Sequence, residues 1–496
     1  MLSTPDAAVA ARAKYEPVIG LEVHVQLLTA TKIFCSCSTG FGDPPNTNVC
    51  PVCLGLPGAL PVLNRKAVEF ATLAAMALNC RINETSIFAR KNYFYPDLPK
   101  GYQISQYDKP LAESGFIEIP AAEGAGTSRK KKIGITRVHL EEDAGKSLHE
   151  GFSDAGEKTA IDLNRTGVPL IEIVSEPDIA SPDEAYEYLT RLKEIILYTG
   201  VSDCNMEEGS LRCDANVSVR PRGQKEFGTK AEVKNVNSFR FIRDALEYEI
   251  ERQIGVLESG GKVVQETRLY NSAEGKTYSM RSKEQAYDYR YFPEPDLLPL
   301  VVDENWKAEI AKVLPELPEA RRQRMISDYG ITEYDAQVLT VSTALADQFE
   351  AAAKAAKNAK RVANLVQGEL MGRLKAQGLA IEQSPISMQG VAASADLVES
   401  GAISGKMLKD FYDLCFERGK DFPAIYEEEG RPEQSRDTSA LERIIDELLA
   451  ANPKQVEQYR AGKKTVIGFF VGQVMKASKG QANPQLVNEL LSKKLE

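Results

Sequence analysis

Hydrophobic and polar residues alternate along two stretches in the N-terminal half of the chain. In residues 18–27, apolar side chains occupy every odd position, and Glu22, His24 and Gln26 lie between them. This period of two is typical of a half-buried strand. Glu22 and His24 would then share one face, about 7 Å apart along the strand. We interpret them as a ligand pair, although a strand whose polar face meets water has the same pattern.

The second alternating stretch begins at Ser210. Arg212, Asp214 and Asn216 share one face, and Leu211 and Cys213 begin the apolar face. We interpret the Asp as a metal ligand and the Arg as a bidentate partner for phosphate or carboxylate. A structural ladder of ion pairs would give the same alternation.

Longer periods predict helices at residues 64–79, 181–200 and 239–258, and after Pro299 the pattern is helical almost to the end of the chain. The prediction is therefore an α+β fold of several domains. Its parts are a flexible segment at 1–14, a strand-rich domain at 15–298, an all-α domain at 299–405 and a small α-helical domain at 406–496.

The composition is that of an ordinary globular protein. The chain has 496 residues, a length that predicts two to four domains. Of these residues, 43% are hydrophobic and 27% are charged. No apolar run approaches the 18 residues of a membrane span, and the first 14 residues lack the apolar core of a signal peptide. We expect a cytoplasmic protein that makes no contact with a membrane.

Charge is distributed unevenly along the chain. The net charge is −10, yet residues 451–496 contain eight Lys or Arg against three Glu. A basic tail on an acidic body suggests a polyanionic partner, and a solvated helical face is the alternative. The candidate nucleic-acid contacts are Lys463, Lys464, Lys476 and Lys479.

An acidic segment precedes a sequence that resembles the end of a phosphate-binding loop. Glu141, Glu142 and Asp143 come just before Gly145-Lys146-Ser147. Three carboxylates would repel a bare phosphate, so this combination makes sense with a divalent cation between acids and phosphates, and Mg²⁺ prefers such hard oxygen ligands. A solvated acidic turn is the simpler alternative.

Four cysteines form two close pairs. Cys35 and Cys37 are separated from Cys50 and Cys53 by a segment rich in Gly and Pro. Two thiolate pairs on a turn-rich loop have the spacing of a structural zinc knuckle, which has no open position for catalysis. Disulfides and free buried thiols are the alternatives, and the absence of a secretory segment argues against disulfides.

Several contiguous motifs resemble the GatB family, the B subunits of the glutamyl-tRNA(Gln)/aspartyl-tRNA(Asn) amidotransferases. The resemblance runs from about residue 15 to the C-terminus. The motifs are Gly20-Leu-Glu-Val-His-Val25, Lys91-Asn-Tyr-Phe-Tyr-Pro-Asp97, Gly101-Tyr-Gln-Ile-Ser-Gln106, Leu140-Glu-Glu-Asp-Ala-Gly-Lys146, Asp162-Leu-Asn-Arg-Thr-Gly167, Tyr287-Asp-Tyr-Arg-Tyr-Phe-Pro-Glu-Pro-Asp296 and Met475-Lys-Ala-Ser-Lys-Gly-Gln-Ala-Asn-Pro484.

The resemblance implies a fold and a reaction. The first domain would be a cradle-shaped catalytic domain with a fold like glutamine synthetase and guanido kinases, and the tail would be a YqeY-related, tRNA-binding domain. ATP would phosphorylate the side-chain carboxylate of Glu or Asp misacylated on tRNA, and ammonia would then displace the phosphate. The chain has no amidase or glutaminase signature. The family's separate amidase, GatA, would therefore supply ammonia, and its small partner, GatC, would complete a heterotrimer.

The resemblance also implies roles for individual residues. The Mg²⁺ ligands would be Glu22, His24, Glu142 and Asp214, with Glu141 as a neighbouring candidate. The catalytic candidates are Glu142, Glu141, His24 and Arg212, and the candidates for holding ATP phosphates are Lys146, Arg165 and Arg212. The zinc knuckle occurs in only some members of this family, so zinc is a prediction from this sequence itself.

Two other functions fit parts of the pattern. One is a stand-alone ATP-dependent ligase that joins an amine to a small carboxylic acid without tRNA. The other is a non-catalytic tRNA-binding scaffold, which the three acidic segments argue against.

Overall fold

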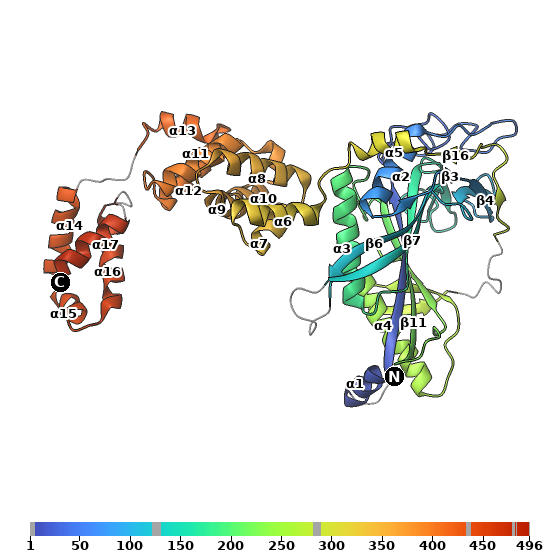
Figure 1. The fold of residues 1–496 in the computed structure, drawn as a ribbon, viewed down its shortest axis with the longest axis horizontal. Coiled ribbons are helices and arrows are strands. Elements are labelled where there is room, and N and C mark those ends of the chain that lie inside the picture. Colours follow the sequence, from blue (N-terminus) through green and yellow to red (C-terminus); the bar gives the residue numbers. More distant parts are fainter. Residues whose placement is uncertain are drawn as a thin grey trace. The chain divides into compact units, whose positions relative to one another are not determined.

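The chain folds into two units. The computed structural model describes residues 5–121, 130–280, 289–432, 438–478, 482 and 484–495. The N-terminal unit comprises residues 1–317 and the C-terminal unit residues 318–496. Each unit is described by itself (Figure 1).

A nine-stranded sheet forms the centre of the N-terminal unit, in the order β14-β13-β12-β11-β1-β10-β7-β6-β2. All neighbours are antiparallel except β12 and β13. The strands are β1 (Tyr15–Gln26), β2 (Arg81–Ile82), β6 (Ala112–Pro120), β7 (Lys130–Glu142), β10 (Pro169–Ser175), β11 (Leu211–Pro221), β12 (Ala231–Lys234), β13 (Thr267–Asn271) and β14 (Lys276–Ser279).

Burial of one face fixes the register of the central strand β1. Leu21, Val23 and Val25 are completely buried, whereas Glu22 and His24 between them are only half-buried. Each buried Val or Leu side chain contributes roughly 1.5–3 kcal/mol. A slip of one residue would exchange the two faces and lose these contributions, so the alternation predicted for 18–27 is confirmed.

Three helices pack in the core of this unit, and all three were predicted. They are α2 (Arg65–Ala77), α3 (Pro182–Thr199) and α4 (Phe239–Glu258). The Ser181 and Ser238 hydroxyls accept backbone N–H bonds at the starts of α3 and α4, and Asn64 does the same for α2. Such caps satisfy donors that a helix start leaves free. Helix α3 ends at Gly200 in the left-handed conformation, with φ 68°.

Short strands and one more helix complete the unit. Small sheets are formed by β15-β4-β5, by β16-β3 and by β8-β9. Their elements are β3 (Thr85–Ser86), β4 (Phe88–Asn92), β5 (Tyr102–Gln106), β8 (Lys146–Leu148), β9 (Ala160–Asp162), β15 (Phe292–Pro293) and β16 (Leu300–Val301), and the helix is α5 (Glu304–Ala311).

The structure divides the first part of the chain differently from two predicted boundaries. Residues 5–14 form the helix α1 (Pro5–Lys14) instead of a flexible segment, with Ala11 buried and Lys14 Nζ 2.7 Å from the Glu258 carboxylate of α4. The unit also continues to residue 317, because α5 packs on α2, where the Arg65 guanidinium lies 4.8 Å from the Trp306 ring centroid.

The C-terminal unit contains only helices among its described elements, as predicted. The first group is α6 (Pro318–Tyr329), α7 (Glu333–Leu339), α8 (Thr343–Ala355), α9 (Ala359–Asn364), η1 (Leu365–Leu370), α10 (Met371–Gln377), η2 (Ile381–Gln383), α11 (Met388–Glu399), α12 (Gly405–Arg418) and α13 (Phe422–Glu428). The second is α14 (Thr438–Ala451), α15 (Pro453–Arg460), η3 (Lys464–Val466), α16 (Ile467–Ala477) and α17 (Pro484–Leu495).

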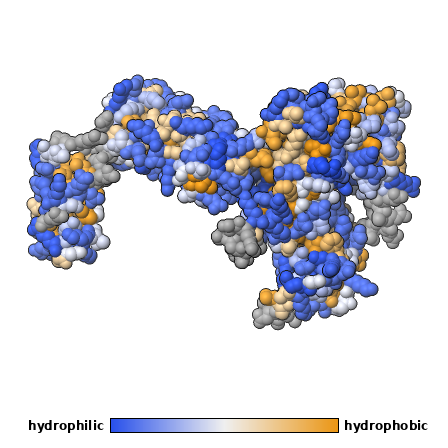
Figure 2. Space-filling model, viewed as in Figure 1, coloured by the Kyte–Doolittle hydropathy of each residue, from blue (hydrophilic) through white to orange (hydrophobic). Residues whose placement is uncertain are grey.

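Each group of helices has its own hydrophobic core. The first core includes Phe349 together with Phe411, Tyr412 and Ile425, and the second begins at Leu441. Helices α12 and α13, which follow the predicted boundary at 405, pack in the first core. In Figure 2, hydrophobic residues form patches on the visible surface of the N-terminal unit, among mostly hydrophilic ones.

Candidate active site

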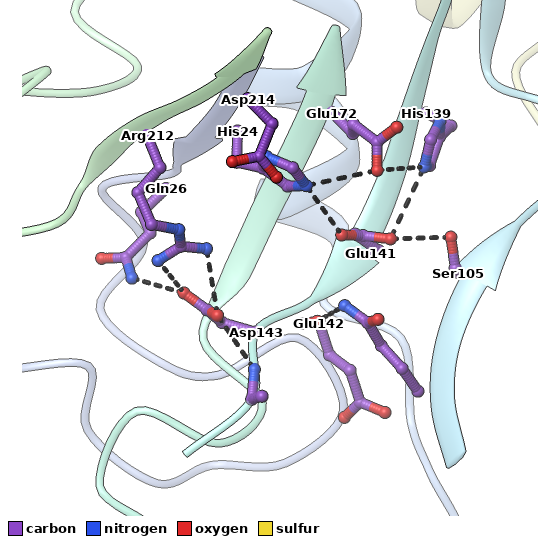
Figure 3. Close-up of polar contacts among 12 residues, drawn as sticks. His24, Gln26, Ser105, His139, Glu141, Glu142, Asp143, Glu172, Arg212 and Asp214 are labelled. Atoms are coloured by element: carbon purple, nitrogen blue, oxygen red, sulfur yellow. Dashed lines mark hydrogen bonds and ion pairs between the residues drawn. The ribbon is translucent and has the colours of Figure 1, made fainter. Parts of the chain in front are cut away.

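Polar side chains from four neighbouring strands meet on the face of the sheet opposite its buried apolar residues. The register places His24 of β1 beside Arg212 of β11 on one side and Glu172 of β10 on the other. Glu172 is in turn beside His139 of β7. Because side chains at paired positions share a face, the four form one row across the sheet (Figure 3).

Glu141, two residues after His139 on the same face of β7, joins this row, so two histidines and two carboxylates lie together. The His24 Nε2 atom lies 3.3 Å from Glu172 Oε2 and 3.9 Å from Glu141 Oε1. His139 Nε2 lies 3.5 Å from a carboxylate oxygen of each of the same two residues. Ser105 Oγ donates a 2.8 Å hydrogen bond to Glu141, and both carboxylates are buried.

The surroundings keep both carboxylates ionised. Burial alone raises the pKa of Glu172, but His139 and His24 outweigh it and hold that pKa well below its usual value. Burial likewise raises the pKa of Glu141, but the net pKa is lowered, chiefly by the hydrogen bond from His139. Burial lowers the pKa of His139, but the two carboxylates raise it to about 9. The two ionised carboxylates therefore carry negative charge that His139, protonated at neutral pH, partly offsets.

The middle of this row, together with Glu141, could hold a metal ion. A ligand atom from each of His24, Glu141 and Glu172 lies within 4.8 Å of the others. Two ionised carboxylates and one imidazole suit a divalent cation, and three protein ligands leave positions for water or phosphate oxygens.

The predicted Mg²⁺ ligands are only partly brought together. Glu22 and Asp214 are paired in register on the same polar face of the sheet. Glu22 precedes His24 by two residues along β1. Glu22 accepts a 2.9 Å hydrogen bond from Asn216, and Asp214 lies 3.2 Å from Lys234 Nζ. Burial, followed by nearby carboxylates, raises the pKa of Glu22. Among the described residues, neither belongs to the group of ligand atoms around His24.

Glu142 departs most from the prediction. It follows Glu141 in strand β7, so its side chain points to the opposite face. There it is buried, forms an ion pair with Lys100 and accepts a 2.8 Å hydrogen bond from the Ile104 backbone N–H. The structure therefore does not group Glu142 with Glu22, His24 and Asp214 as the prediction required.

Glu172 was not predicted as a site residue, and His139 was given no role. Glu172 is the only charged residue in Pro169-Leu-Ile-Glu-Ile-Val-Ser175, a buried strand. A single carboxylate inside an apolar strand needs a partner, and that signal was available. His139 is one of three histidines in the chain and lies two residues before Glu141 on the same strand.

Asp143 forms the corner beside this row. Its carboxylate accepts hydrogen bonds from both terminal nitrogens of Arg212, at 2.9 and 3.1 Å, and from Gln26 at 2.7 Å. Arg165 donates to the carbonyl oxygens of Ala144 and Gly145. Burial raises the pKa of Asp143, but Arg212 and Arg165 outweigh it and the net pKa is lowered. The two arginines thus hold the turn between β7 and β8.

A cleft of about 490 Å³ opens beside this corner, a size suited to a nucleotide. Lys146, Arg165 and Arg212, the three predicted phosphate partners, all line it. The side chain of Lys146 is exposed. Residues 145–147 do not form a phosphate-binding loop, because strand β8 rather than a helix follows Gly145.

The four early cysteines come together as predicted. One sulfur from each of Cys35, Cys37, Cys50 and Cys53 lies within 4.8 Å of the others, and all eight cysteines of the chain are free thiols. A hydrogen bond from Cys35, with further help from the Cys50 backbone and the charge of Lys32, lowers the pKa of Cys53 to about 5. Four convergent sulfurs, one favoured as a thiolate, fit a tetrahedral zinc ion.

The predicted nucleic-acid lysines lie in the second group of C-terminal helices. Lys463, Lys464 and Lys476 are exposed, and the Lys464 ammonium lies 4.1 Å from the Tyr459 ring centroid. Lys479 lies outside the described residues. In the part of the chain that the structure describes, no helix combines the length and apolar character needed to cross a membrane.

Comparisons with known proteins agree with these observations. Residues 17–308 match the model of the GatB/GatE catalytic domain, and residues 347–495 match that of the GatB domain, GatB_Yqey. Proteins named as B subunits of aspartyl/glutamyl-tRNA(Asn/Gln) amidotransferases are similar throughout. Those of Carboxydothermus hydrogenoformans and Syntrophotalea carbinolica are 57% identical over 97% of this chain and 99% of their own length. The protein of Geobacter sulfurreducens is 56% identical over the same shares.

Proposed function

Because the chain belongs to the GatB family of amidotransferase B subunits, we propose that it converts Glu-tRNA(Gln), Asp-tRNA(Asn) or both to the correctly amidated forms. The γ-phosphoryl group of ATP passes to a side-chain carboxylate oxygen, giving an acyl phosphate and ADP. Ammonia then attacks the carbonyl carbon, the bond to the phosphate oxygen breaks, and phosphate leaves as the nitrogen loses a proton. Phosphorylation is needed because a carboxylate has no good leaving group.

The cluster of His24, Glu141 and Glu172 is the observation on which we assign this reaction to the polar face of the sheet. Its two ionised carboxylates lie beside a cleft lined by three cations. Held there, Mg²⁺ would neutralise phosphate charge during phosphoryl transfer. Glu22 and Asp214 lie on the same surface, where they can act on water bound outside the first ligands.

The cations of the cleft divide into two roles. Arg212 and Arg165 hold Asp143 and the turn that follows it, and so position the cleft wall. Lys146 projects from that wall with its side chain exposed, so it is the cation most open to a phosphate oxygen. This division explains why three basic residues surround one corner.

Three further parts of the proposal concern a structural metal ion, the fold of the N-terminal unit and the contacts with tRNA. The cysteine cluster holds a structural zinc ion, because its four sulfurs leave no position open for substrate. The N-terminal unit is a cradle-shaped catalytic domain with the fold of glutamine synthetase and guanido kinases. The last group of helices is a YqeY-related domain whose Lys463, Lys464 and Lys476 contact tRNA.

The chain must work with partners. It contains no amidase or glutaminase signature, so the amidase GatA supplies ammonia and the small GatC protein completes a heterotrimer. Misacylated tRNA is the macromolecular substrate, and the cytoplasm is where it occurs. A ligase for free small acids would need neither the basic tail nor a tRNA substrate, and the names of the relatives do not favour it.

The test uses this chain co-expressed with GatA and GatC. With γ-³²P-ATP, Mg²⁺, glutamine and Glu-tRNA(Gln), we expect ATP cleavage that depends on the tRNA and is lost in Glu141→Gln and Glu172→Gln. Glu118→Gln, at an exposed carboxylate of β6, is the matched control. Cleavage that is indifferent to tRNA and to both substitutions would point instead to a small-acid ligase or a scaffold.

A further inference from the structure

The candidate nucleotide cleft is bordered by the loop of the cysteine cluster. Residues 39–43 of that loop line it, together with Lys146 and Arg165. The Phe41 side chain at the tip of this loop is 71% exposed. An isolated exposed Phe is common on protein surfaces, so its exposure matters only through its position.

Hydrogen bonds anchor the loop on both sides of Phe41. On one side, the Thr39 hydroxyl bonds to the Thr29 carbonyl oxygen. On the other, the Asn164 side-chain amide donates to the carbonyl oxygens of Asp43 and Pro44, at 3.3 and 2.8 Å. The intervening loop tip is therefore held at the cleft rather than extending freely into solvent.

Phe41 also has neighbours that leave its ring accessible. Gly40 and Gly42 flank it, and Gly42 has φ +83°, a conformation that residues with a Cβ rarely adopt. Within the described residues, the Phe41 ring has no aromatic or cationic partner, and it is the only aromatic side chain that lines the cleft. An aromatic face is thus free in a cleft that otherwise offers charges and small apolar groups.

From this arrangement we infer that Phe41 is a binding residue of the nucleotide cleft, whose ring stacks on an adenine base. The inference rests on the proposed function, because Lys146 of the same cleft would take a phosphate of ATP. A base has a flat π-face, and an exposed aromatic ring offers a surface on which it can stack. The rim of the cleft supplies one such surface, Phe41.

Adenine has two sources in this reaction, ATP and the terminal adenosine of tRNA. We assign the ring to ATP, because Lys146, an exposed cation of the same cleft, would contact a phosphate of that nucleotide. The five acidic residues that also line the cleft suit the Mg²⁺ that accompanies a triphosphate. Separate binding measurements with ATP and with tRNA distinguish the two sources.

The experiment measures three affinities with the full-length chain. The variant is Phe41→Ala, and Phe227→Ala is the matched control, because Phe227 is also exposed, at 63%, but does not line the cleft. The probes are ATP with Mg²⁺, inorganic tripolyphosphate with Mg²⁺, and tRNA. We expect Phe41→Ala to weaken ATP binding about tenfold or more, as loss of one stacked base does, and to leave tripolyphosphate and tRNA binding unchanged.

A second variant reports on stacking directly. The chain has a single tryptophan, Trp306, in α5. Phe41→Trp adds one indole at the cleft, so we expect ATP to quench the added fluorescence and tripolyphosphate to leave it unchanged. This variant keeps an aromatic face and should bind ATP as tightly as the parent chain.

Each contrary outcome has a distinct meaning. Unchanged ATP affinity in Phe41→Ala overturns the inference alone. Equal loss of ATP and tripolyphosphate binding also overturns it, because the ring would then only shape the loop. Weaker tRNA binding with unchanged ATP binding would assign the ring to tRNA instead. If the parent chain itself does not bind ATP, the proposed function fails as well.

Discussion

Glu141 and Glu142 are adjacent in the chain but lie in opposite environments of strand β7. Glu141 faces two histidines on the polar side of the sheet, 3.9 Å from His24 Nε2. Glu142 faces away from them and pairs with the buried ammonium of Lys100. Two residues of the same type therefore have separate tasks, which substitutions can distinguish.

Metal binding should depend on Glu141 and Glu172 but not on Glu142. We expect Glu141→Gln or Glu172→Gln to weaken Mn²⁺ binding, used in place of Mg²⁺, by at least the roughly 10–100-fold typical of losing an outer partner of a ligand. Glu142→Gln keeps an acceptor for the Ile104 N–H and should retain the parent affinity. Electron paramagnetic resonance of free Mn²⁺ measures all three, and loss of binding in Glu142→Gln alone would reverse the assignment.

The pair of Lys100 and Glu142 should matter for stability. Lys100→Met leaves a carboxylate buried without its cation, which costs about 3–5 kcal/mol. The double variant Lys100→Met/Glu142→Gln has no buried charge at this position and should regain most of that loss. Urea unfolding followed by the fluorescence of Trp306, the single tryptophan, reports on the N-terminal unit. A Lys100→Met variant as stable as the parent would contradict this interpretation of the pair.

Acid should reduce the contribution of the Asp143 carboxylate to folding stability. Its pKa is lowered below the ordinary value of 3.8, because Arg212 and Arg165 outweigh the effect of burial. The ionised form therefore adds stability that is complete above pH 3.8 and is lost as the pH falls through the lowered pKa. Asp143→Asn should be less stable than the parent at pH 7, with a difference that shrinks towards pH 3.

Urea midpoints between pH 3 and pH 7, again followed by Trp306 fluorescence, test this dependence. Asp183→Asn is the control, because the Asp183 side chain is 86% exposed and should leave the pH profile unchanged. A difference between Asp143→Asn and the parent that is constant with pH would show that the charge of Asp143 does not stabilise the fold.

The cysteine cluster should bind zinc in the purified protein. We expect one equivalent of zinc by elemental analysis, and much less in Cys50→Ser, because a tetrahedral site with three sulfurs loses affinity. Cys80→Ser is the control, since Cys80 lies outside the cluster. Chelation should also lower the urea midpoint of the N-terminal unit. A protein without zinc and with four titratable thiols in the loop would rule out a metal site here.

The basic tail should contribute salt-dependent binding of tRNA. Lys463→Glu, Lys464→Glu and Lys476→Glu should each weaken binding and reduce the slope of log K against log salt by about one unit per lost phosphate contact. Lys406→Glu, at an exposed position of α12, is the control. Filter binding at several salt concentrations measures the slope, and three unchanged slopes would place the tRNA contacts elsewhere.

Local patterns were sufficient for much of the fold. The alternation around His24 predicted β1, and the capping residues Asn64, Ser181 and Ser238 mark the starts of three predicted helices. Each depends on a few neighbouring residues, so the sequence carries the whole signal. The four cysteines were also predictable, because two close pairs of ligands on one loop can meet with little help from the rest of the chain.

The composition of the site depended on contacts between distant segments. Glu172 joins His24 only because β10 lies beside β1, and no local pattern states that strand order. Glu142 lies away from His24 because adjacent positions on a strand face opposite ways. The cores of the helical unit depend on distant contacts in the same way, since Phe411 and Phe349 share a core although they lie in helices far apart in the sequence.

The central strand of the sheet is also the first of its nine strands to be synthesised. Strand β1 (Tyr15–Gln26) pairs with β10 (Pro169–Ser175) and β11 (Leu211–Pro221), and with no strand of the sheet nearer to it in sequence. At about 5–20 residues per second, it waits roughly 10–40 s for its second neighbour to be made. During that time at least one edge of β1 is unpaired and its apolar face is uncovered, so the nascent chain needs protection from aggregation until residue 221 has emerged from the ribosome.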